Sequence, residues 1–290
     1  MTTKLISLDP TAVRDVVARA LDEDRVSQDV TTKVTVLPDQ AGHGSMIVKQ
    51  AGILCGVDLV REVFIQLGGE VTLEERVADG EAVEYGQVVV TLAGPLVQLL
   101  VGERVALNFL QRMSGIATLT RAVVDSAAEG GHARITDTRK TTPGLRALER
   151  YAVRAGGGRN HRDNLADGVL IKDNHLAAAS ARGVTMPELL RKARELAPHL
   201  QRIEVEVADV ATVLQAIDAG ADVVMLDNMT VQEMVESVEV AAGRVLLEAS
   251  GGVNLQTVRE VASTGVDLIS IGALTHSASA LDISLEVGPA

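Results

Sequence analysis

The residues best suited to chemistry in this sequence form a basic segment in its middle. Between residues 134 and 172 nine lysines and arginines stand against four acids, although the 290-residue chain has a formal net charge of −12. Arg139, Lys140, Arg162 and Lys172 stand at the ends of apolar runs, where charges are partly desolvated and need anions. Because arginine pairs two-on-two with carboxylate or phosphate, the segment predicts a ligand rich in such groups.

Other residues of this segment are open to two interpretations. Arg146, Arg150 and Arg154 follow one another at four-residue spacing, and a solvated helix face is the simpler account of them. His161 follows the glycines of GGGRNHR and stands beside Arg162. It either donates a hydrogen bond to the ligand, which we favour, or caps a turn.

Carboxylates occupy two further strand ends. Glu204 and Glu206 lie two residues apart in IEVEV, so in a regular strand both point to the same side. Asp227 follows the apolar run DVVML and completes an oxygen-ligand set suited to Mg²⁺, whereas no histidine and cysteine spacing supports zinc. We expect Glu206, nearer the strand end, to serve the site, and Glu204 to pair with the basic residues.

Two glycine-rich strand ends complete the set. They are ASGG at residues 249–252 and IGA at residues 271–273. Glycine lets backbone N–H groups approach phosphate oxygens, and the last two units of a (β/α) barrel commonly hold phosphate. The alternative is that these glycines merely end their strands, but two such clusters on consecutive units favour phosphate binding.

These residues need elements that bring them together. From about residue 132, six apolar runs each lead into polar residues and a helical stretch, a pattern typical of parallel strands buried on both faces. The runs are ARITDTRK, GVLIKDNH, RIEVEV, DVVMLDN, RVLLEASGG and DLISIGA. A barrel and a doubly wound sheet both fit. The barrel is favoured because each run ends in a chemically active residue, and a barrel gathers its strand ends at one mouth.

The first half of the chain predicts a smaller α/β layer. A helix begins at Pro10 with Asp9 as its N-cap, a second helix lies near residues 57–67, and EVTLEERV and QVVVTLAG predict paired hairpin strands. VADGEAVEYGQVV is similar to the hairpin of biotin- and lipoyl-carrier modules, but no lysine stands at its turn, so a structural hairpin is favoured. Helical spacing over residues 96–128, interrupted near Gly115, predicts two helices.

Composition excludes several classes of protein. With 47% apolar and 23% charged residues the chain is neither disordered nor fibrous, and its single cysteine, Cys55, allows no intrachain disulfide and no CxxC site. The acidic net charge and the absence of tryptophan disfavour nucleic-acid binding. Neither a secretion leader nor an 18-residue apolar span is recognisable. We therefore expect a cytoplasmic, enzyme-sized protein without a membrane partner.

Taken together, the motifs resemble one family. TDTRKTTPGLRALERYAVRAGGGRNHR is followed by LIKDNH, EVEV, MLDN and LEASGG, and preceded by DVTT and GERVALNFLQRMSGIAT. Nearly end to end, these strings are similar to the quinolinate phosphoribosyltransferases of NAD biosynthesis. The resemblance implies an α/β fold in three parts: an N-terminal α/β sandwich (residues 1–113), an incomplete (β/α) barrel with phosphate-binding loops at the strand C-terminal mouth (114–273), and a C-terminal segment returning to the first domain (274–290).

The resemblance also implies an activity and a first substrate site. Quinolinate and phosphoribosyl pyrophosphate would react, with Mg²⁺, to give nicotinate mononucleotide, pyrophosphate and CO₂. The two quinolinate carboxylates would be held by Arg139, His161, Arg162 and Lys172. Arg104 of the GER motif would be contributed across the interface of a homodimer.

A second set of residues would serve phosphoribosyl pyrophosphate. The resemblance implies that Lys140, Glu206 and Asp227 are catalytic, that Glu206 and Asp227 hold the metal, and that Glu248 contacts the ribose. The remaining substrate-binding positions are Thr138 and the residues of two phosphate loops, Ala249, Ser250, Gly251, Ser270, Ile271 and Gly272. Carboxylates near the sugar suit an oxocarbenium-like state, while Mg²⁺ and Lys140 suit a pyrophosphate leaving group.

Two other functions fit parts of the sequence. Lys172 at the end of an apolar strand would suit a Schiff-base aldolase, which predicts borohydride trapping at that lysine. The glycine clusters would suit a non-catalytic phosphosugar-binding protein, which predicts binding without pyrophosphate release. The number of carboxylate-matching arginines favours the transferase over both.

Overall fold

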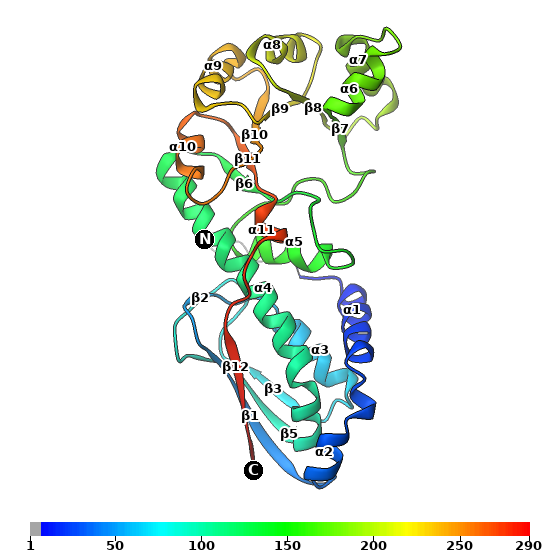
Figure 1. The fold of residues 1–290 in the computed structure, drawn as a ribbon, viewed down its shortest axis with the longest axis vertical. Helices are drawn as coiled ribbons and strands as arrows, with labels where there is room; N and C mark the ends of the chain where they lie inside the picture. Colours follow the sequence, from blue (N-terminus) through cyan, green and yellow to red (C-terminus); the bar gives the residue numbers. More distant parts are fainter. Residues whose placement is uncertain (1–6) are drawn as a thin grey trace. The chain divides into compact units, whose positions relative to one another are not determined.

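Figure 1 shows the computed structural model of the chain, which describes residues 7–290. Residues 1–6, on which part of the leader expectation rests, lie outside the described residues. The chain divides into two compact units. The first consists of the described residues up to Arg121 together with Thr141–Gly157 and Leu274–Ala290, and the second of Ala122–Lys140 and Gly158–Ala273.

An antiparallel sheet organises the first unit. Its order is β12-β1-β5-β3, with β12 at Ile283–Pro289, β1 at Ala41–Val48, β5 at Val88–Pro95 and β3 at Thr72–Glu75. The antiparallel pairing of β3 with β5 confirms the predicted hairpin strands. Two short strands, β2 (Gly52–Ile53) and β4 (Ala82–Val83), pair separately. The C-terminal strand β12 pairs with β1, so that Met46 lies opposite Leu285.

The first unit also contains helical segments besides most of the long helix α4 (Leu96–Gly130), which is described below. They are α1 at Pro10–Glu23, the 3₁₀ turn η1 at Val26–Gln28, α2 at Val30–Thr35, α3 at Val57–Gln66 and α5 at Arg146–Ala155. The predicted cap of α1 is confirmed, since the Asp9 side chain accepts a hydrogen bond from Thr11 N at 2.9 Å. The buried stripe of α1, which includes Val17 and Leu21, packs against α3. The short helix α11 (Ala273–His276) follows the last strand of the second unit.

One helix differs from the sequence prediction. The apolar spacing predicts a break near Gly115, but α4 runs without interruption over Leu96–Gly130. Gly115 serves close packing instead, because a Cβ atom at this position would collide with the carbonyl oxygen of Ser279. Within residues 7–290 no helix combines the length and the apolar character that crossing a membrane requires.

A six-stranded parallel sheet organises the second unit. Its order is β6-β11-β10-β9-β8-β7, and every neighbouring pair is parallel. The strands are β6 at Arg134–Thr136, β7 at Val169–Ile171, β8 at Ile203–Val207, β9 at Val223–Asp227, β10 at Leu246–Ser250 and β11 at Leu268–Ser270. All six predicted strands are therefore confirmed. Because β6 and β7 stand at the two ends of the order, the sheet is an incomplete barrel and not a closed one.

Helices follow the strands along the second unit. They are α6 at Asp173–Ser180, α7 at Met186–Leu196, α8 at Val210–Asp218, α9 at Val231–Ala241 and α10 at Val258–Ser263. Strand β8 is buried at all five positions, as expected for a parallel strand covered on both faces. One face of β8 is apolar, and the other carries Glu204 and Glu206.

The second compact unit ends at Ala273, where the family resemblance also places a segment boundary, whereas the first unit runs past the implied boundary at residue 113. Helix α4 is continuous and carries the first unit on to Arg121, and α5 with its preceding loop also belongs to the first unit. Tyr151 on α5 donates its hydroxyl to Asp79 at 2.9 Å, and buried Glu149 pairs with Arg112 at 2.7 Å. Helix α5 therefore forms part of the core of the first unit.

This placement changes the interpretation of the basic residues on α5. Arg150 is only 8% exposed, so the solvated helix face that we considered the simpler account is wrong for this residue. The Arg154 guanidinium lies 5.6 Å from the centre of the Tyr151 ring on the same helix. The reason is that most positions of α5 are buried, including Leu148 to Val153, whereas its sequence spacing alone suggests one exposed stripe.

Candidate active site

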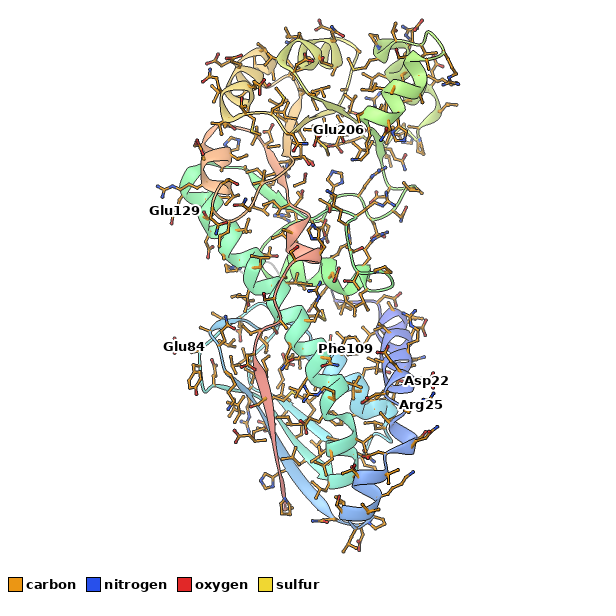
Figure 2. The ribbon with its side chains drawn as sticks, viewed as in Figure 1. Asp22, Arg25, Glu84, Phe109, Glu129 and Glu206 are labelled. Carbon is orange, nitrogen blue, oxygen red and sulfur yellow. The ribbon has the colours of Figure 1, made fainter. Side chains whose placement is uncertain are left out.

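One face of the parallel sheet carries the acidic residues of the predicted site. Glu206 on β8 and Glu248 on β10 are both in register with Met225 on the strand between them. Asp227 on β9 and Ser250 on β10 are in register with each other, two residues beyond Met225 and Glu248. Because side chains alternate along a strand, they point to the same side of the sheet as Met225 and Glu248. In Figure 2 Glu206 lies below the strands, and Figure 1 shows α8 and α9 above them. The strand ends thus gather these side chains on the face away from α8 and α9.

A buried cluster joins His161 to two glutamates on this face. His161 Nε2 lies 3.3 Å from Glu204 Oε2 and 3.4 Å from Glu248 Oε2. Glu204 is 8% exposed and Glu248 is 1% exposed. On the other side of the ring, Nδ1 accepts a hydrogen bond from the backbone N–H of Arg162 at 2.7 Å. The cluster connects strands β8 and β10 to the loop that carries His161 and Arg162.

Burial and hydrogen bonding act in opposite directions on the protons of this cluster. Burial disfavours charge in this place, whereas the hydrogen bonds to Glu204 and Glu248 hold the proton on Nε2 of His161. Burial raises the pKa of Glu204, the hydrogen bond from His161 opposes this, and the charge of Glu248 adds to it. A proton is therefore held firmly between the ring and the two carboxylates.

Asp137 fixes the loop that carries the basic residues. It is fully buried, and its carboxylate accepts hydrogen bonds from Asn160 Nδ2 at 2.6 Å and from the backbone N–H of His161 at 2.8 Å. The backbone adds two bonds, because Asp137 N donates to Arg159 O and Arg159 N donates to Ile135 O. The motifs TDTRK and GGGRNHR are consequently bound to each other at the end of β6.

Arg139 and Arg162 lie close enough to influence each other. Burial lowers the pKa of Arg162, and the positive charge of Arg139 lowers it further. Both residues are half-buried. Two guanidinium groups held together in a partly desolvated place form a site that a dianion would stabilise, which is the ligand chemistry that the sequence predicts.

Lys172 and Glu206 form an ion pair at the ends of neighbouring strands. The Lys172 Nζ atom lies 3.0 Å from Glu206 Oε2, the lysine side chain is 47% exposed, and the glutamate side chain is 9% exposed. Lys172 belongs to the predicted quinolinate site and Glu206 to the predicted phosphoribosyl pyrophosphate site, so the ion pair joins residues of the two predicted sites.

A backbone hydrogen bond joins the residue that follows β9 to the last residue of β10. Asn228, at a φ of 55°, donates its backbone N–H to Ser250 O at 2.9 Å and its side-chain amide to Asp227 Oδ2 at 2.8 Å. Gly251 has a φ of +94°, and a Cβ atom there would collide with the Asn228 side chain. Glycine is therefore required at this position of the predicted phosphate loop, residues 249–251, whose shape depends on the preceding MLDN motif.

The second predicted phosphate loop, residues 270–272, follows a polar pair of strand ends. Ser270 on β11 is in register with Thr136 on β6, and Ile271 N donates to Thr136 O at 3.0 Å. Ser270 Oγ and Thr136 Oγ1 are buried, and neither atom has a hydrogen-bond partner within residues 7–290. Buried hydroxyls without partners are costly, so these two groups are well placed to bind a polar ligand or water.

The remaining predicted residues lie in two different units. Thr138 Oγ1 accepts a hydrogen bond from the backbone N–H of Lys140 at 3.1 Å, and Lys140 is exposed at the end of the second unit's first segment. Arg104 belongs to α4 of the first unit, and its side chain is 61% exposed, 4.0 Å from Glu103. An exposed arginine at this position is accessible to a ligand or to a second chain.

Two site residues are absent from the set that the sequence predicts. Asp137 holds the GGGRNHR loop, and Glu204 contacts His161, which agrees with the expected pairing of Glu204 with basic residues. For Asp137 the sequence signal is weak, since an acid beside Arg139 has an obvious local partner. For Glu204 the two-residue spacing from Glu206 identifies the face but not the partner.

The fold and the site together define a class of protein: an α/β barrel whose strand ends carry arginines, carboxylates and glycine loops, a combination suited to anionic ligands. Comparison with known proteins makes this specific. The family described as "Quinolinate phosphoribosyl transferase, N-terminal domain" matches residues 29–114, and the corresponding "C-terminal domain" matches residues 116–286. The chain belongs to the quinolinate phosphoribosyl transferase family.

Individual relatives agree along almost the whole chain. The chain is 44% identical to the nicotinate-nucleotide pyrophosphorylase [carboxylating] of Mycobacterium leprae over 95% of this chain and 97% of that protein. It is 43% identical to the probable nicotinate-nucleotide pyrophosphorylase [carboxylating] of Bacillus subtilis, over 91% and 90%. The solved structure of the nicotinate-nucleotide pyrophosphorylase from Francisella tularensis superposes with a TM-score of 0.93 at 36% identity, covering 99% of this chain and 100% of that one. The resemblance and the fold class predicted from the sequence are thereby confirmed.

Proposed function

We infer that this chain transfers the phosphoribosyl group of phosphoribosyl pyrophosphate to quinolinate with decarboxylation, giving nicotinate mononucleotide, pyrophosphate and CO₂ in NAD biosynthesis. The observation that carries this function is the match of both family domains across residues 29–286. The paired arginines on the barrel supply a chemical reason, since quinolinate carries two adjacent carboxylates. The chain is on this basis a pentosyltransferase.

The quinolinate site is proposed at the end of β6 and β7. Arg139, Arg162 and Lys172 would pair with the two carboxylates, with His161 beside them. Asp137 supports this arrangement because it fixes the backbone of the loop in which His161 and Arg162 stand. A ligand carboxylate would also relieve the repulsion between Arg139 and Arg162.

The phosphoribosyl pyrophosphate site is proposed along β8 to β11. Lys140 would contact the pyrophosphate, and the loops at 249–251 and 270–272 the 5′-phosphate. Glu248 would accept a ribose hydroxyl, because its Oε1 atom is buried and lacks a hydrogen-bond partner within the described residues. Ser270 Oγ is a second unsatisfied group at the phosphate side of this site.

The acidic residues fit a magnesium ion. Asp227 is the last residue of β9, Glu206 is the last residue but one of the adjacent strand β8, and carboxylate oxygens are hard ligands of the kind that Mg²⁺ prefers. We propose that these two residues hold the ion, directly or through water. When bound, Mg²⁺ would supply charge neutralisation to the pyrophosphate. The Lys172 partner of Glu206 would then be released toward quinolinate.

The reaction follows from the placement of charge. As the anomeric carbon–oxygen bond breaks, its electron pair leaves with pyrophosphate, and the carboxylates near the sugar stabilise the oxocarbenium-like carbon. The quinolinate ring nitrogen then donates its lone pair to that carbon and becomes cationic. Breaking the bond to the 2-carboxylate releases CO₂, and the cationic ring holds the remaining electrons until a proton replaces the lost group. No covalent enzyme intermediate is required.

The assembly and the location of the chain are also proposed. Arg104 is exposed on α4, and we propose that it completes the quinolinate site of a partner subunit in a homodimer. A cytoplasmic enzyme without membrane or nucleic-acid partners agrees with the acidic composition.

A choice between acceptors tests the function. Purified chain would be incubated with phosphoribosyl pyrophosphate, Mg²⁺ and either quinolinate or nicotinate, and pyrophosphate release would be measured. Quinolinate should support turnover, and nicotinate, which lacks the 2-carboxylate, should not. Equal rates with both acceptors, or binding of quinolinate without any pyrophosphate release, would contradict the proposed function.

A further inference from the structure

The His161 ring uses both of its nitrogen atoms in contacts with the protein. Nε2 faces the carboxylates of Glu204 and Glu248, and Nδ1 faces the backbone N–H of Arg162. Because an N–H group points at Nδ1, that atom acts as an acceptor, and the ring proton is assigned to Nε2. The ring therefore donates toward the glutamates and accepts from the residue that follows it.

This orientation argues against a metal centre at the same three residues. By type they are suitable, since one nitrogen and two carboxylate oxygens lie within 4.8 Å of one another. A metal-bound histidine, however, donates its second ring N–H to an acceptor. Here the second nitrogen faces a donor, the Arg162 N–H. The ring is thus held by hydrogen bonds and is not arranged to ligate a cation.

Glu204 is costly in its position. It is 8% exposed on a strand whose other face is apolar, and its Oε1 atom is buried without a hydrogen-bond partner in the described part of the chain. An apolar residue there would avoid the cost of burying a carboxylate, so a purely structural strand gains nothing from it. The contact that Glu204 makes is with His161, and through His161 with Arg162.

We propose that Glu204 is a positioning residue for quinolinate: with Glu248 it holds the His161 ring across strands β8 and β10, and the ring in turn fixes the backbone from which the Arg162 guanidinium projects. Asp137 holds the same backbone one residue earlier, at His161 N. Arg162 is thus anchored from two sides. This inference rests on the proposed function, because it assigns Arg162 to the quinolinate carboxylates.

The test uses full-length chain and two substitutions. Glu204→Ala removes the acceptor, and Glu204→Gln keeps an oxygen that can accept from Nε2 without the charge. Because a lost hydrogen bond to a buried group costs more than 1 kcal/mol, Glu204→Ala should raise the KM for quinolinate about tenfold, while the KM for phosphoribosyl pyrophosphate changes less than about twofold. Glu204→Gln should recover most of the loss, to within about threefold of the parent chain.

Controls separate this role from a structural one. Glu239, exposed on α9 of the same unit, provides matched substitutions, Glu239→Ala and Glu239→Gln, which should leave both KM values unchanged. An unchanged quinolinate KM in Glu204→Ala, or an equal rise for both substrates, would overturn the inference. So would calorimetric binding of Zn²⁺ alone that disappears in Glu204→Ala. If the parent chain releases pyrophosphate from quinolinate normally, these results concern Glu204 only; absence of turnover in the parent chain would reject the proposed function, and the inference with it.

Discussion

At the scale of single residues, the charged side chains of the site are positioned by ion pairs and hydrogen bonds to other charged residues. Arg162 is the residue on which most of these contacts converge, through His161, Asp137 and Arg139. Its guanidinium supplies a planar pair of donors, and lysine or alanine cannot reproduce this geometry. We therefore expect a substitution of Arg162 to distinguish most clearly between binding of quinolinate and binding of phosphoribosyl pyrophosphate.

Arg162→Ala should raise the KM for quinolinate about a hundredfold, because charge-assisted hydrogen bonds to a carboxylate are lost, and should spare phosphoribosyl pyrophosphate. Steady-state kinetics with each substrate varied in turn measures this. Arg259→Ala is the control, since Arg259 is an exposed arginine of the same unit that pairs with Glu129. Equal weakening of both substrates would contradict the division of roles.

Asp227→Asn should lower kcat about a hundredfold and weaken the dependence of the rate on Mg²⁺, because the carboxylate proposed to hold the metal becomes a neutral amide. The Asn228 side chain can still contact residue 227, so the loop should keep its shape. A magnesium titration of the rate is the measurement, with Asp218→Asn on the exposed end of α8 as control. Unchanged turnover and magnesium dependence would remove Asp227 from the site.

At the scale of elements, Asp79 joins two helices of the first unit. Its Oδ1 atom accepts from the backbone N–H groups of Gly56 and Val57 at the start of α3, and its Oδ2 atom accepts from the Tyr151 hydroxyl on α5. Asp79→Ala should lower the free energy of unfolding by about 2–4 kcal/mol, because it leaves three buried donors without an acceptor. Asp79→Asn keeps an acceptor for α3 and should lose much less, as urea unfolding can measure.

The same residue predicts a pH dependence of stability. Burial raises the pKa of Asp79 above its ordinary value of 3.8, although its hydrogen bonds oppose this. The folded chain therefore binds this proton more tightly than the unfolded chain, and the contribution is lost as pH rises from 3.8 through the raised pKa. Asp79→Asn has no such titration, so its stability relative to the parent chain should improve between pH 4 and pH 7. A constant difference over that range would show that Asp79 does not titrate differently on folding.

Some elements could be predicted from sequence and others could not, for identifiable reasons. The six parallel strands follow from their apolar runs, and the cap of α1 from Asp9 and Pro10. The continuity of α4 could not be predicted, because a glycine that permits close packing against Ser279 looks like a helix break when read along the chain. Similarly, the burial of Arg150 depends on what packs against α5.

The candidate site could likewise be predicted only in part from the sequence. Residue types and strand ends indicate which side chains gather on one face, and they identify Glu206, Asp227 and Lys172. They do not indicate that the loop after α5 returns to β6 and presents His161 to Glu204, since this contact joins residues 43 positions apart through a backbone pairing with no sequence signal. The role of Asp137, and the identity of the basic residue that contacts Glu204, are therefore recognisable only in the folded chain.

At the scale of the whole molecule, the account predicts sites shared between two chains. If Arg104 acts in a partner's site, Arg104→Ala and Asp227→Asn chains should each be nearly inactive alone but should complement each other when co-expressed. Random pairing makes roughly half of the dimers mixed, each with one intact site, so about a quarter of the parent activity should return. Co-expression of Arg162→Ala with Asp227→Asn is the control and should recover nothing, because each chain then carries a damaged barrel. Failure of the first pair to recover activity would place Arg104 outside the partner's site.

In the proposed reaction, one barrel holds a pyridine dicarboxylate beside an activated sugar and removes the carboxylate next to the ring nitrogen. Quinolinate labelled with carbon-13 in its 2-carboxylate tests this directly, by following labelled CO₂ and pyrophosphate in the same reaction. The account predicts one labelled CO₂ for each pyrophosphate, and none when phosphoribosyl pyrophosphate is omitted. Pyrophosphate release with the label retained in the product, or labelled CO₂ without phosphoribosyl pyrophosphate, would contradict it.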